Sequence, residues 1–286
     1  MIAGLPKAAQ AMRTVPAGEF ILGYPNARGQ LTGRPLLPAS EDPGRLLLPD
    51  PTGSGAVDFG RNGTYLVFRQ LEQDVERFWQ FVDAATRRAD GSQDARDRAA
   101  LAAKMVGRWP SGAPLVKAPD HDAPALADDN DFAYRDDPRG LACPIGAHIR
   151  RANPRDSLGP EPAASLDASD RHRLLRRGRS YGPAGDGTQS AGGENGLYFI
   201  CLAADLARQF EFVQHTWLNN ATFNGLYDDA DPLTGSRHPA GATFTVPARP
   251  VRHRYRGLPQ FVRTRGGAYF FLPGVSAVRY LAQLGR

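Results

Sequence analysis

Two segments that pass directly from a strand-like run into a helix-like run constrain this chain most. The first, "NGTYLVFRQLEQDVERFWQFVDAATRR" from Asn62, begins with β-branched and aromatic residues. It continues with apolar residues at helical spacing: Leu71, Val75, Phe78, Phe81 and Val82. The second, "GLYFICLAA" from Gly196, leads into "DLARQFEFVQHTWL". Because each strand must bury one face under a helix, the pattern predicts an α+β domain whose sheet carries helices on one face.

Further patterns predict the remaining elements. A helix is expected in "DRAALAAKMVGRW", ending near Trp109-Pro110, and another near "DASDRHRLLRR", residues 167–177. Two apolar runs joined by Arg265-Gly266-Gly267 favour a hairpin, followed by a last helix in "VSAVRYLAQL". Residues 110–142 are rich in Asp and Pro and indicate long ordered loops.

Residues 1–60 differ in composition from the rest of the chain. They are rich in Pro and Gly and lack a sustained period, so we expect them to wrap the surface as loop without building a core. The predicted organisation is therefore a connector over residues 1–60 and one folded domain over residues 61–286.

Composition limits the class of protein. Hydrophobic residues make up 41% and charged residues 23%, enough for a sizeable core, and no apolar run approaches the roughly 18 residues of a membrane span. No signal peptide is visible at this start, so the expectation is a cytoplasmic protein without a membrane partner. Cys143 and Cys201 give neither a disulfide framework nor a CxxC pattern, which argues against a structural zinc site.

The net charge of +5 is concentrated in one strip. Six arginines and no acid occur between Arg249 and Arg265. They fit either a nucleic-acid or phosphate face or a solvated approach to a strand. No RNA-recognition motif accompanies the strip, so we expect no nucleic-acid partner.

The stretch "CPIGAHIRRANPRD", Cys143 to Asp156, places His148 among apolar neighbours and arginines. An imidazole that ligates iron needs a fixed ring, an acceptor for its second nitrogen and an apolar wall, and nearby cations can neutralise anionic groups of a cofactor. We expect Arg151 to be exposed to solvent. The alternative is that His148 is a packed core residue.

A second basic stretch, "LLRRGRSYGP", places Arg176 and Arg177 just before Gly178. At a helix end, a guanidinium could project over a pocket and stabilise negative charge on a leaving oxygen. The alternative is a basic helix terminus that complements the helix dipole.

Seven stretches, taken in chain order, resemble the dye-decolourising (DyP-type) haem peroxidases. They are "GEFILGYPN", "GRNGTYLVFRQLEQDV", "MVGRWPSGAPL", "CPIGAHIRRANPRD", "LLRRGRSYGP", "GLYFICLAADLARQFEFVQHTWLNN" and "FVRTRGGAYFFLPG". The resemblance implies a ferredoxin-like α+β fold of the dimeric α+β barrel type, built as two halves. The chain is similar to the C-terminal, haem-carrying half with the connector that leads into it.

The resemblance also implies site residues. His148 corresponds to the proximal ligand of the haem iron and Arg176 to the distal arginine. Arg155 corresponds to a haem propionate partner, Leu197 and Phe199 to the distal wall, and Asp231 to the carboxylate behind the histidine. For Asp231, an Asp-Pro turn residue is the alternative. Trp79, Trp109 and Trp217 are expected in the core.

The implied function is a peroxidase with non-covalent haem b that uses hydrogen peroxide to oxidise small aromatic or other reducing substrates. Family members carry a Gly-x-x-Asp-Gly loop whose Asp is the acid–base residue, and the 286 residues contain none; "GPAGDG" has Pro183 at the first position. We therefore expect impaired turnover, and apolar surface left by a lost N-terminal half that favours a homo-oligomer. The alternative is a haem-binding or interaction fragment without turnover.

Overall fold

The computed structural model describes residues 14–182, 195–236 and 241–284. Its main sheet has the strand order β5-β6-β4-β9 and is antiparallel throughout. The strands are β4 (Thr64–Gln73), β5 (Leu175–Tyr181), β6 (Gly196–Ala203) and β9 (Val262–Leu272). Helices separate β4 from β5 and β6 from β9, so the order along the chain is β-α-β-β-α-β. The predicted ferredoxin-like α+β fold is confirmed.

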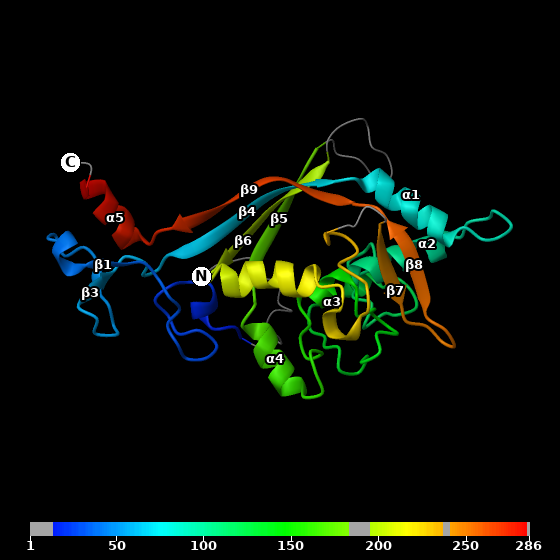
Figure 1. Ribbon diagram of the computed structural model, residues 1–286, viewed down its shortest axis with the longest axis horizontal. Coiled ribbons are helices and arrows are strands. Elements are labelled where there is room, and N and C mark those ends of the chain that lie inside the picture. The colour runs from blue at the N-terminus through cyan, green and yellow to red at the C-terminus, as the bar shows by residue number, and fades with distance from the viewer. Residues whose placement is uncertain (1–13, 183–194, 237–240, 285–286) are drawn as a thin grey trace.

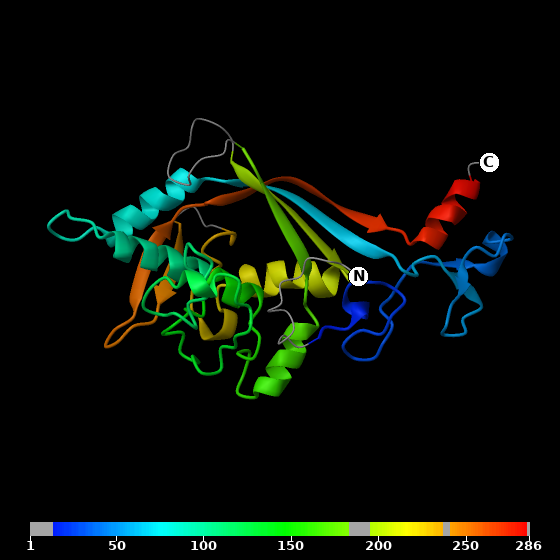
Figure 2. The same ribbon diagram turned by 180° about the vertical axis from the view of Figure 1, so that it is seen from behind.

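Helices gather on one side of this sheet (Figures 1 and 2). They are α1 (Val75–Thr86), α2 (Ala95–Val106), α3 (His148–Ala152) and α4 (Pro162–Asp170), with the final helix α5 (Val275–Leu284) beyond one end of the sheet. Under the sheet runs the helix formed by η5 (Ala207–Glu211) and η6 (Val213–Leu218), which are continuous through Phe212. Short helical turns are η2 (Ala17–Glu19), η3 (Ala39–Glu41), η4 (Pro124–Leu126) and η7 (Phe223–Gly225).

The strand register divides the sheet into two faces. Residues opposite one another in neighbouring strands point to the same side, which places Arg176, Cys201 and Val67 on one face. Val67 and Cys201 are buried against Phe210 of η5, so we call this the covered face. The opposite, open face carries large apolar side chains that remain exposed: Leu175, Ile200, Phe270 and Leu272.

The first strand is longer than its sequence pattern indicated. Leu71 belongs to β4, which continues to Gln73, because β4 pairs with β6 and β9 along its whole length. The helix α1 then begins at Val75, where the Asp74 carboxylate accepts a hydrogen bond from the Arg77 N–H at 2.9 Å. Val82 is the fully buried residue of α1, as its spacing predicted.

The helix predicted over residues 167–177 is wrong in its second half. Helix α4 ends at Asp170, and Leu175 already lies in strand β5. Arg176 and Arg177 pair with Cys201 and Ile200 of β6, so they sit on a strand and not at a helix end. Pairing with a buried strand here overrides local helix propensity. Most of the Gly-rich segment after Tyr181, including Pro183, lies outside the described residues.

The predicted hairpin around Arg265-Gly266-Gly267 is also wrong, because the segment forms one continuous strand, β9. Gly266 and Gly267 lie opposite Gln70 and Arg69, and an irregularity in the pairing at Gln70/Leu71 takes up the extra residue. A two-stranded ribbon does form just before β9, from β7 (Ala242–Val246) and β8 (His253–Leu258).

The N-terminal segment is not loop alone. Three short strands, β1 (Leu36–Pro38), β2 (Leu48–Pro49) and β3 (Ala56–Asp58), form a sheet of order β1-β3-β2. Leu47 of this region packs with Ala277 and Tyr280 of α5, and the two elements lie together at one end of the molecule in Figure 1. Contrary to the expectation, residues before 60 contribute a small core.

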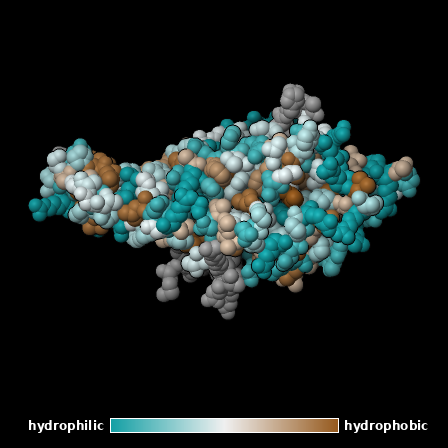
Figure 3. All heavy atoms as spheres, turned by 60° about the horizontal axis from the view of Figure 1, so that its bottom comes forward, coloured by the Kyte–Doolittle hydropathy of each residue, from teal (hydrophilic) through white to brown (hydrophobic). Residues whose placement is uncertain are grey.

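Other features agree with the sequence. Cys143 and Cys201 are free and buried. Trp109 and Trp217 are buried, and Trp79 is partly buried against the core around Val82. Within the described ranges, no helix is long and apolar enough to cross a membrane. On the helix-bearing side of the molecule, hydrophobic residues form small patches among hydrophilic ones (Figure 3).

Candidate active site

His148 is the first residue of α3, and its ring is held from behind. Its Nδ1 lies 2.9 Å from Oδ2 of Asp231, which is fully buried. The other oxygen of Asp231 accepts hydrogen bonds from the backbone N–H groups of Leu233 and Thr234 and from the Thr234 hydroxyl. Asp231 therefore serves both roles weighed for it, since it caps the Asp-Pro turn and anchors the histidine.

The protonation of this pair follows from the surroundings of Asp231. Burial by itself would raise the pKa of Asp231, but the charge and hydrogen bond of His148, the Thr234 N–H and the Arg151 cation outweigh it and lower the pKa to about 2. An ionised carboxylate can only accept, so Nδ1 of His148 carries the proton. The Nε2 atom lies on the opposite side of the ring, the position through which a neutral imidazole binds a metal.

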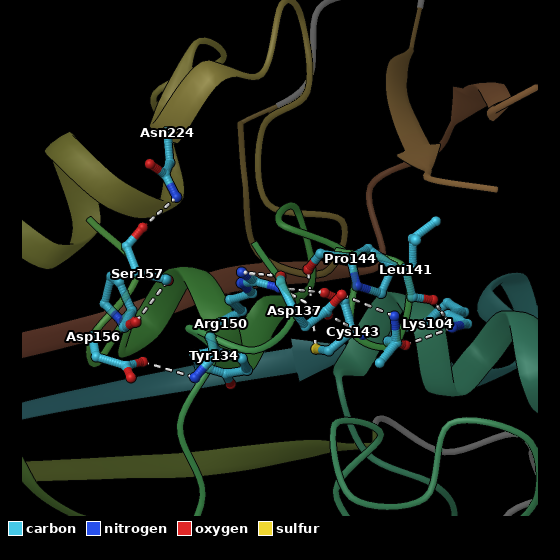
Figure 4. A network of polar contacts seen from close by, with 12 residues as sticks. Lys104, Tyr134, Asp137, Leu141, Cys143, Pro144, Arg150, Asp156, Ser157 and Asn224 are labelled. Atoms are coloured by element: carbon cyan, nitrogen blue, oxygen red, sulfur yellow. Dashed lines mark hydrogen bonds and ion pairs between the residues drawn. The ribbon is translucent and has the colours of Figure 1, made fainter. Parts of the chain in front are cut away.

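The two arginines beside His148 are structural. Arg150 is buried, donates to the carbonyls of Cys143 and Asp137 and pairs with the Asp137 carboxylate, as Figure 4 shows. Arg151 is fully buried and donates to the carbonyls of Trp217, Asn220 and Asp229. The expectation that Arg151 is an exposed cation is wrong. It ties α3 to the end of η6 at Trp217 and to the loop that follows at Asn220 and Asp229.

The residues expected above the histidine share the covered face of the sheet. Arg176, Phe199 and Leu197 all point to this face by register. Leu197 packs over Gly178, where a Cβ atom would lie 2.9 Å from its Cδ1. Phe199 packs with Phe210 of η5, with ring centroids 6.1 Å apart. Because α3 is tied to η6, which lies under this face, His148 and Arg176 lie on the same side of the sheet (Figure 1).

Arg155 lies after α3 in a left-handed backbone conformation, with φ of 54°. Its Nη1 donates to the carbonyls of Asn130 and Phe132, and its guanidinium lies 3.9 Å from the centre of the Phe132 ring. Its Nε and Nη2 have no hydrogen-bond partner in the described part of the chain. Burial lowers the pKa of Arg155, and the neighbouring cations Arg173 and Arg108 act in the same direction.

Two residues near Arg155 were not identified from the sequence. Arg108 lies 5.4 Å from the Phe132 ring, and burial and the charge of Arg176 both lower its pKa. Tyr134 is buried, and its hydroxyl makes no hydrogen bond with any described residue. In the sequence, only the stretch "MVGRW" pointed to Arg108, because it places Arg108 directly after Gly107, the glycine that ends α2.

Three arginines and the Tyr134 hydroxyl show whether the site could hold the anionic groups of a haem. Arg108, Arg155 and Arg176 influence one another electrostatically, and none forms an ion pair within the described residues. Arginines that form no ion pair, beside an unsatisfied buried hydroxyl, indicate an absent anionic group. The haem propionates match that chemistry, and Nε2 of His148 matches the iron. The residues present therefore fit a haem.

Comparison with known proteins agrees with this geometry. A dye-decolorizing peroxidase of Auricularia auricula-judae is 36% identical over 235 residues, a match that covers 76% of this chain and 46% of that protein. The solved structure of a dye peroxidase from Amycolatopsis superposes with a TM-score of 0.63 at 33% identity, covering 76% of this chain and 48% of that one. A dye-decolorizing peroxidase solved with 2,6-dimethoxyphenol gives a TM-score of 0.65 at 30% identity, covering 82% of this chain and 55% of that one.

The chain spans about half the length of these relatives. The family model described as "Dyp-type peroxidase, C-terminal" matches residues 54–251, which is more than half of the chain. The match includes His148, Arg155, Arg176 and Asp231, together with the sheet that places Arg176 above α3. The chain belongs to the Dyp-type peroxidase family.

Proposed function

We propose that this chain binds haem b non-covalently and that the protein is a peroxidase that reduces hydrogen peroxide at the expense of small aromatic reductants. The observation that carries the proposal is the His148–Asp231 pair, 2.9 Å apart, which fixes the ring so that Nε2 points away from the carboxylate. The complex of a relative with 2,6-dimethoxyphenol supports an aromatic reductant.

Each site residue has a task in this proposal. His148 holds the iron through Nε2, and Asp231 fixes the ring and increases its basicity. Arg155, Arg108 and the Tyr134 hydroxyl bind the haem carboxylates. Haem, when bound, supplies the two-electron reduction of peroxide. Arg176 donates hydrogen bonds to the oxygen that gains negative charge as the O–O bond breaks, while Leu197 and Phe199 exclude water.

One sequence observation favours a second candidate, haem binding without efficient turnover. The 286 residues contain no Gly-x-x-Asp-Gly loop. On the covered face of β4, β5 and β6, the register places no carboxylate beside Arg176. An arginine is a poor base, and the missing general acid–base contribution is of order 10²–10⁴-fold in rate. We therefore infer that these residues bind haem better than they turn over peroxide.

Haem titration tests the proposal directly. The full chain is titrated with haem and followed by its Soret absorbance, alongside His148→Ala and His215→Ala. His215 is exposed on η6, so its loss controls for non-specific imidazole binding. Loss of the Soret shift only in His148→Ala is expected. A spectrum unchanged by His148→Ala would show that another residue ligates the iron and would overturn the assignment.

Turnover separates the two candidates. Stopped-flow mixing of the haem-loaded chain with peroxide is expected to show slow reaction. Arg176→Leu should remove most of what remains, since Arg176 is the proposed donor to the breaking O–O bond and Arg69, also on this face, packs on the Phe210 and Tyr269 rings. Fast reaction that is insensitive to Arg176→Leu would contradict both the impairment and the role of Arg176.

A further inference from the structure

A cavity of about 340 Å³ lies beside the C-terminal end of α3, away from the imidazole of His148. Its polar lining includes Asp156, Ser157 and Asn224, and its apolar lining includes Ile145 and Pro138. The volume is at the lower end of the range of small-molecule sites. Tyr134, which has a role proposed above, lines one wall, and the other lining residues have none.

Asp156 is the polar group that a ligand would meet there. Its residue is 4% exposed, and Oδ1 accepts a hydrogen bond from the Tyr134 N–H at 2.7 Å. Oδ2 has no hydrogen-bond partner among the described residues, yet it is not enclosed by protein atoms. Figure 4 shows this oxygen without a contact, next to Ser157, whose carbonyl accepts from the Asn224 side chain. A buried carboxylate oxygen that faces a cavity requires a donor.

The charge of Asp156 determines what kind of donor fits. The neighbouring Arg155 cation interacts favourably with the Asp156 carboxylate. Arg135 also lines the cavity, so a cationic ligand would exceed the negative charge available. A neutral O–H donor satisfies Oδ2 without adding charge.

The apolar part of the cavity lining favours a ligand whose hydroxyl is attached to a flat apolar ring. Pro138, Pro160 and Pro162 line the cavity together with Ile145 and Gly159. Proline rings offer rigid C–H surfaces that pack well on an aromatic face. An aliphatic alcohol small enough to reach Asp156 would leave these walls without contact.

We propose that this cavity binds a neutral aromatic alcohol, a phenol, whose hydroxyl donates to Oδ2 of Asp156. The inference rests on the proposed function, because a phenol is a reducing substrate for a peroxidase. Asp156 directly follows Arg155, the proposed haem partner, so the bound ring would lie next to the haem-binding residues.

Calorimetric titration of the full chain with two ligands tests this site. The probes are 2,6-dimethoxyphenol and its methyl ether, 1,2,3-trimethoxybenzene, which cannot donate. A charge-assisted hydrogen bond should make the phenol bind at least about tenfold more tightly than the ether. In Asp156→Asn the amide oxygen can still accept from Tyr134, while the NH₂ group faces the cavity, and the preference should disappear.

Asp136→Asn is the matched control, because Asp136 is 94% exposed and carries the same charge change near the cavity. It should keep the preference. If Asp156→Asn still binds the phenol more tightly than the ether, the extra methyl group of the ether, and not the hydrogen bond, causes the difference in affinity. That result would overturn the proposal.

A second variant keeps the test valid if Asp156→Asn does not fold. A Cβ atom at Gly159 would meet nothing within 4 Å. Gly159→Phe should therefore fill the cavity without strain and abolish binding of both ligands. Retained binding would place the phenol elsewhere. All titrations are run on haem-free and haem-loaded protein, so a failed phenol site is distinguishable from a failed haem site, which the Soret titration reports.

Discussion

At the scale of single residues, the arginines that follow His148 show that proximity in sequence does not assign a role. Arg151 and Arg155 are four positions apart, yet every described hydrogen bond of Arg151 is to a carbonyl of the fold, while two nitrogens of Arg155 have no hydrogen-bond partner among the described residues. Backbone direction causes the difference. Arg151 is still helical, and the left-handed turn at Arg155 aims its side chain toward Phe132.

Arg151→Ala is expected to destabilise the fold and only indirectly to affect the site. Three buried carbonyls, those of Trp217, Asn220 and Asp229, would lose their donor. The free energy of unfolding should fall by about 3 kcal/mol or more. Urea denaturation measures it, with exposed Arg139→Ala as the control; equal stability of the two variants would show that water replaces the guanidinium at no cost.

Arg155→Asn is expected to release haem faster while it keeps the left-handed turn. Asparagine tolerates the left-handed backbone, so the change removes the guanidinium and keeps the turn. Loss of a charge-assisted hydrogen bond should increase the haem dissociation rate about tenfold or more. Haem transfer to excess apomyoglobin measures this rate. A rate equal to that of Arg139→Asn would argue against Arg155 as a haem partner.

Part of the site could be predicted only through resemblance. The local sequence pattern was compatible with His148 as either a packed core residue or an iron ligand. Nothing in the residue spacing indicated that His148 contacts Asp231. Arg108 and the Tyr134 hydroxyl were missed, because an unsatisfied hydroxyl is a property of three-dimensional packing and leaves no mark in the sequence.

At the scale of elements, the strands were predicted best where apolar residues dominate and worst where they do not. The apolar segment from Tyr198 was predicted as a strand, whereas "LRRGRSY" was predicted to be partly helical. This second segment is a strand because its neighbour β6 supplies the hydrogen bonds. Local propensity contains no information about which strand will lie beside a segment in the fold. The consequence for the site is large, since only a strand directs Arg176 and Arg177 to opposite faces.

The two glycines of β9 should respond differently to the same substitution. A Cβ atom at Gly267 would lie 2.5 Å from the Phe68 carbonyl oxygen, whereas one at Gly266 would meet nothing within 4 Å. Gly267→Ala should destabilise the sheet by about 1–3 kcal/mol, while Gly266→Ala should be neutral or stabilise by about 0.4–1 kcal/mol. Thermal unfolding of the pair is decisive: equal effects would mean that β9 does not hold this register against β4.

At the scale of the whole molecule, the sheet is protected unevenly. Helices cover one face, and Ile200 and Phe270 remain exposed on the other. An antiparallel sheet that faces water normally carries polar residues on that side. The sequence-based division into a connector and a domain at residue 60 stays a prediction, but the small sheet before residue 60 packs on α5 and is part of the same body.

The open face is expected to bind a neutral hydrophobic dye. Nile red fluorescence should rise with the full chain and fall by more than half in the double variant Ile200→Thr, Phe270→Thr, because threonine keeps strand propensity and removes apolar area. Tyr227→Thr serves as the control, since Tyr227 is 83% exposed but lies away from the sheet. Equal dye binding by both variants would show that the open face is not the principal apolar surface.

The packing of Leu47 against Tyr280 has a consequence for how the chain is made. On the ribosome, the strands around Leu47 emerge before α5 and must remain without their packing partner until α5 is released. Strand β4 likewise cannot form its hydrogen bonds with β9, its neighbour on one side in the sheet, until β9 has been synthesised. The segment around Leu47 can therefore reach its native packing only after α5 has emerged, and a nascent chain stalled before α5 should leave it open to proteases.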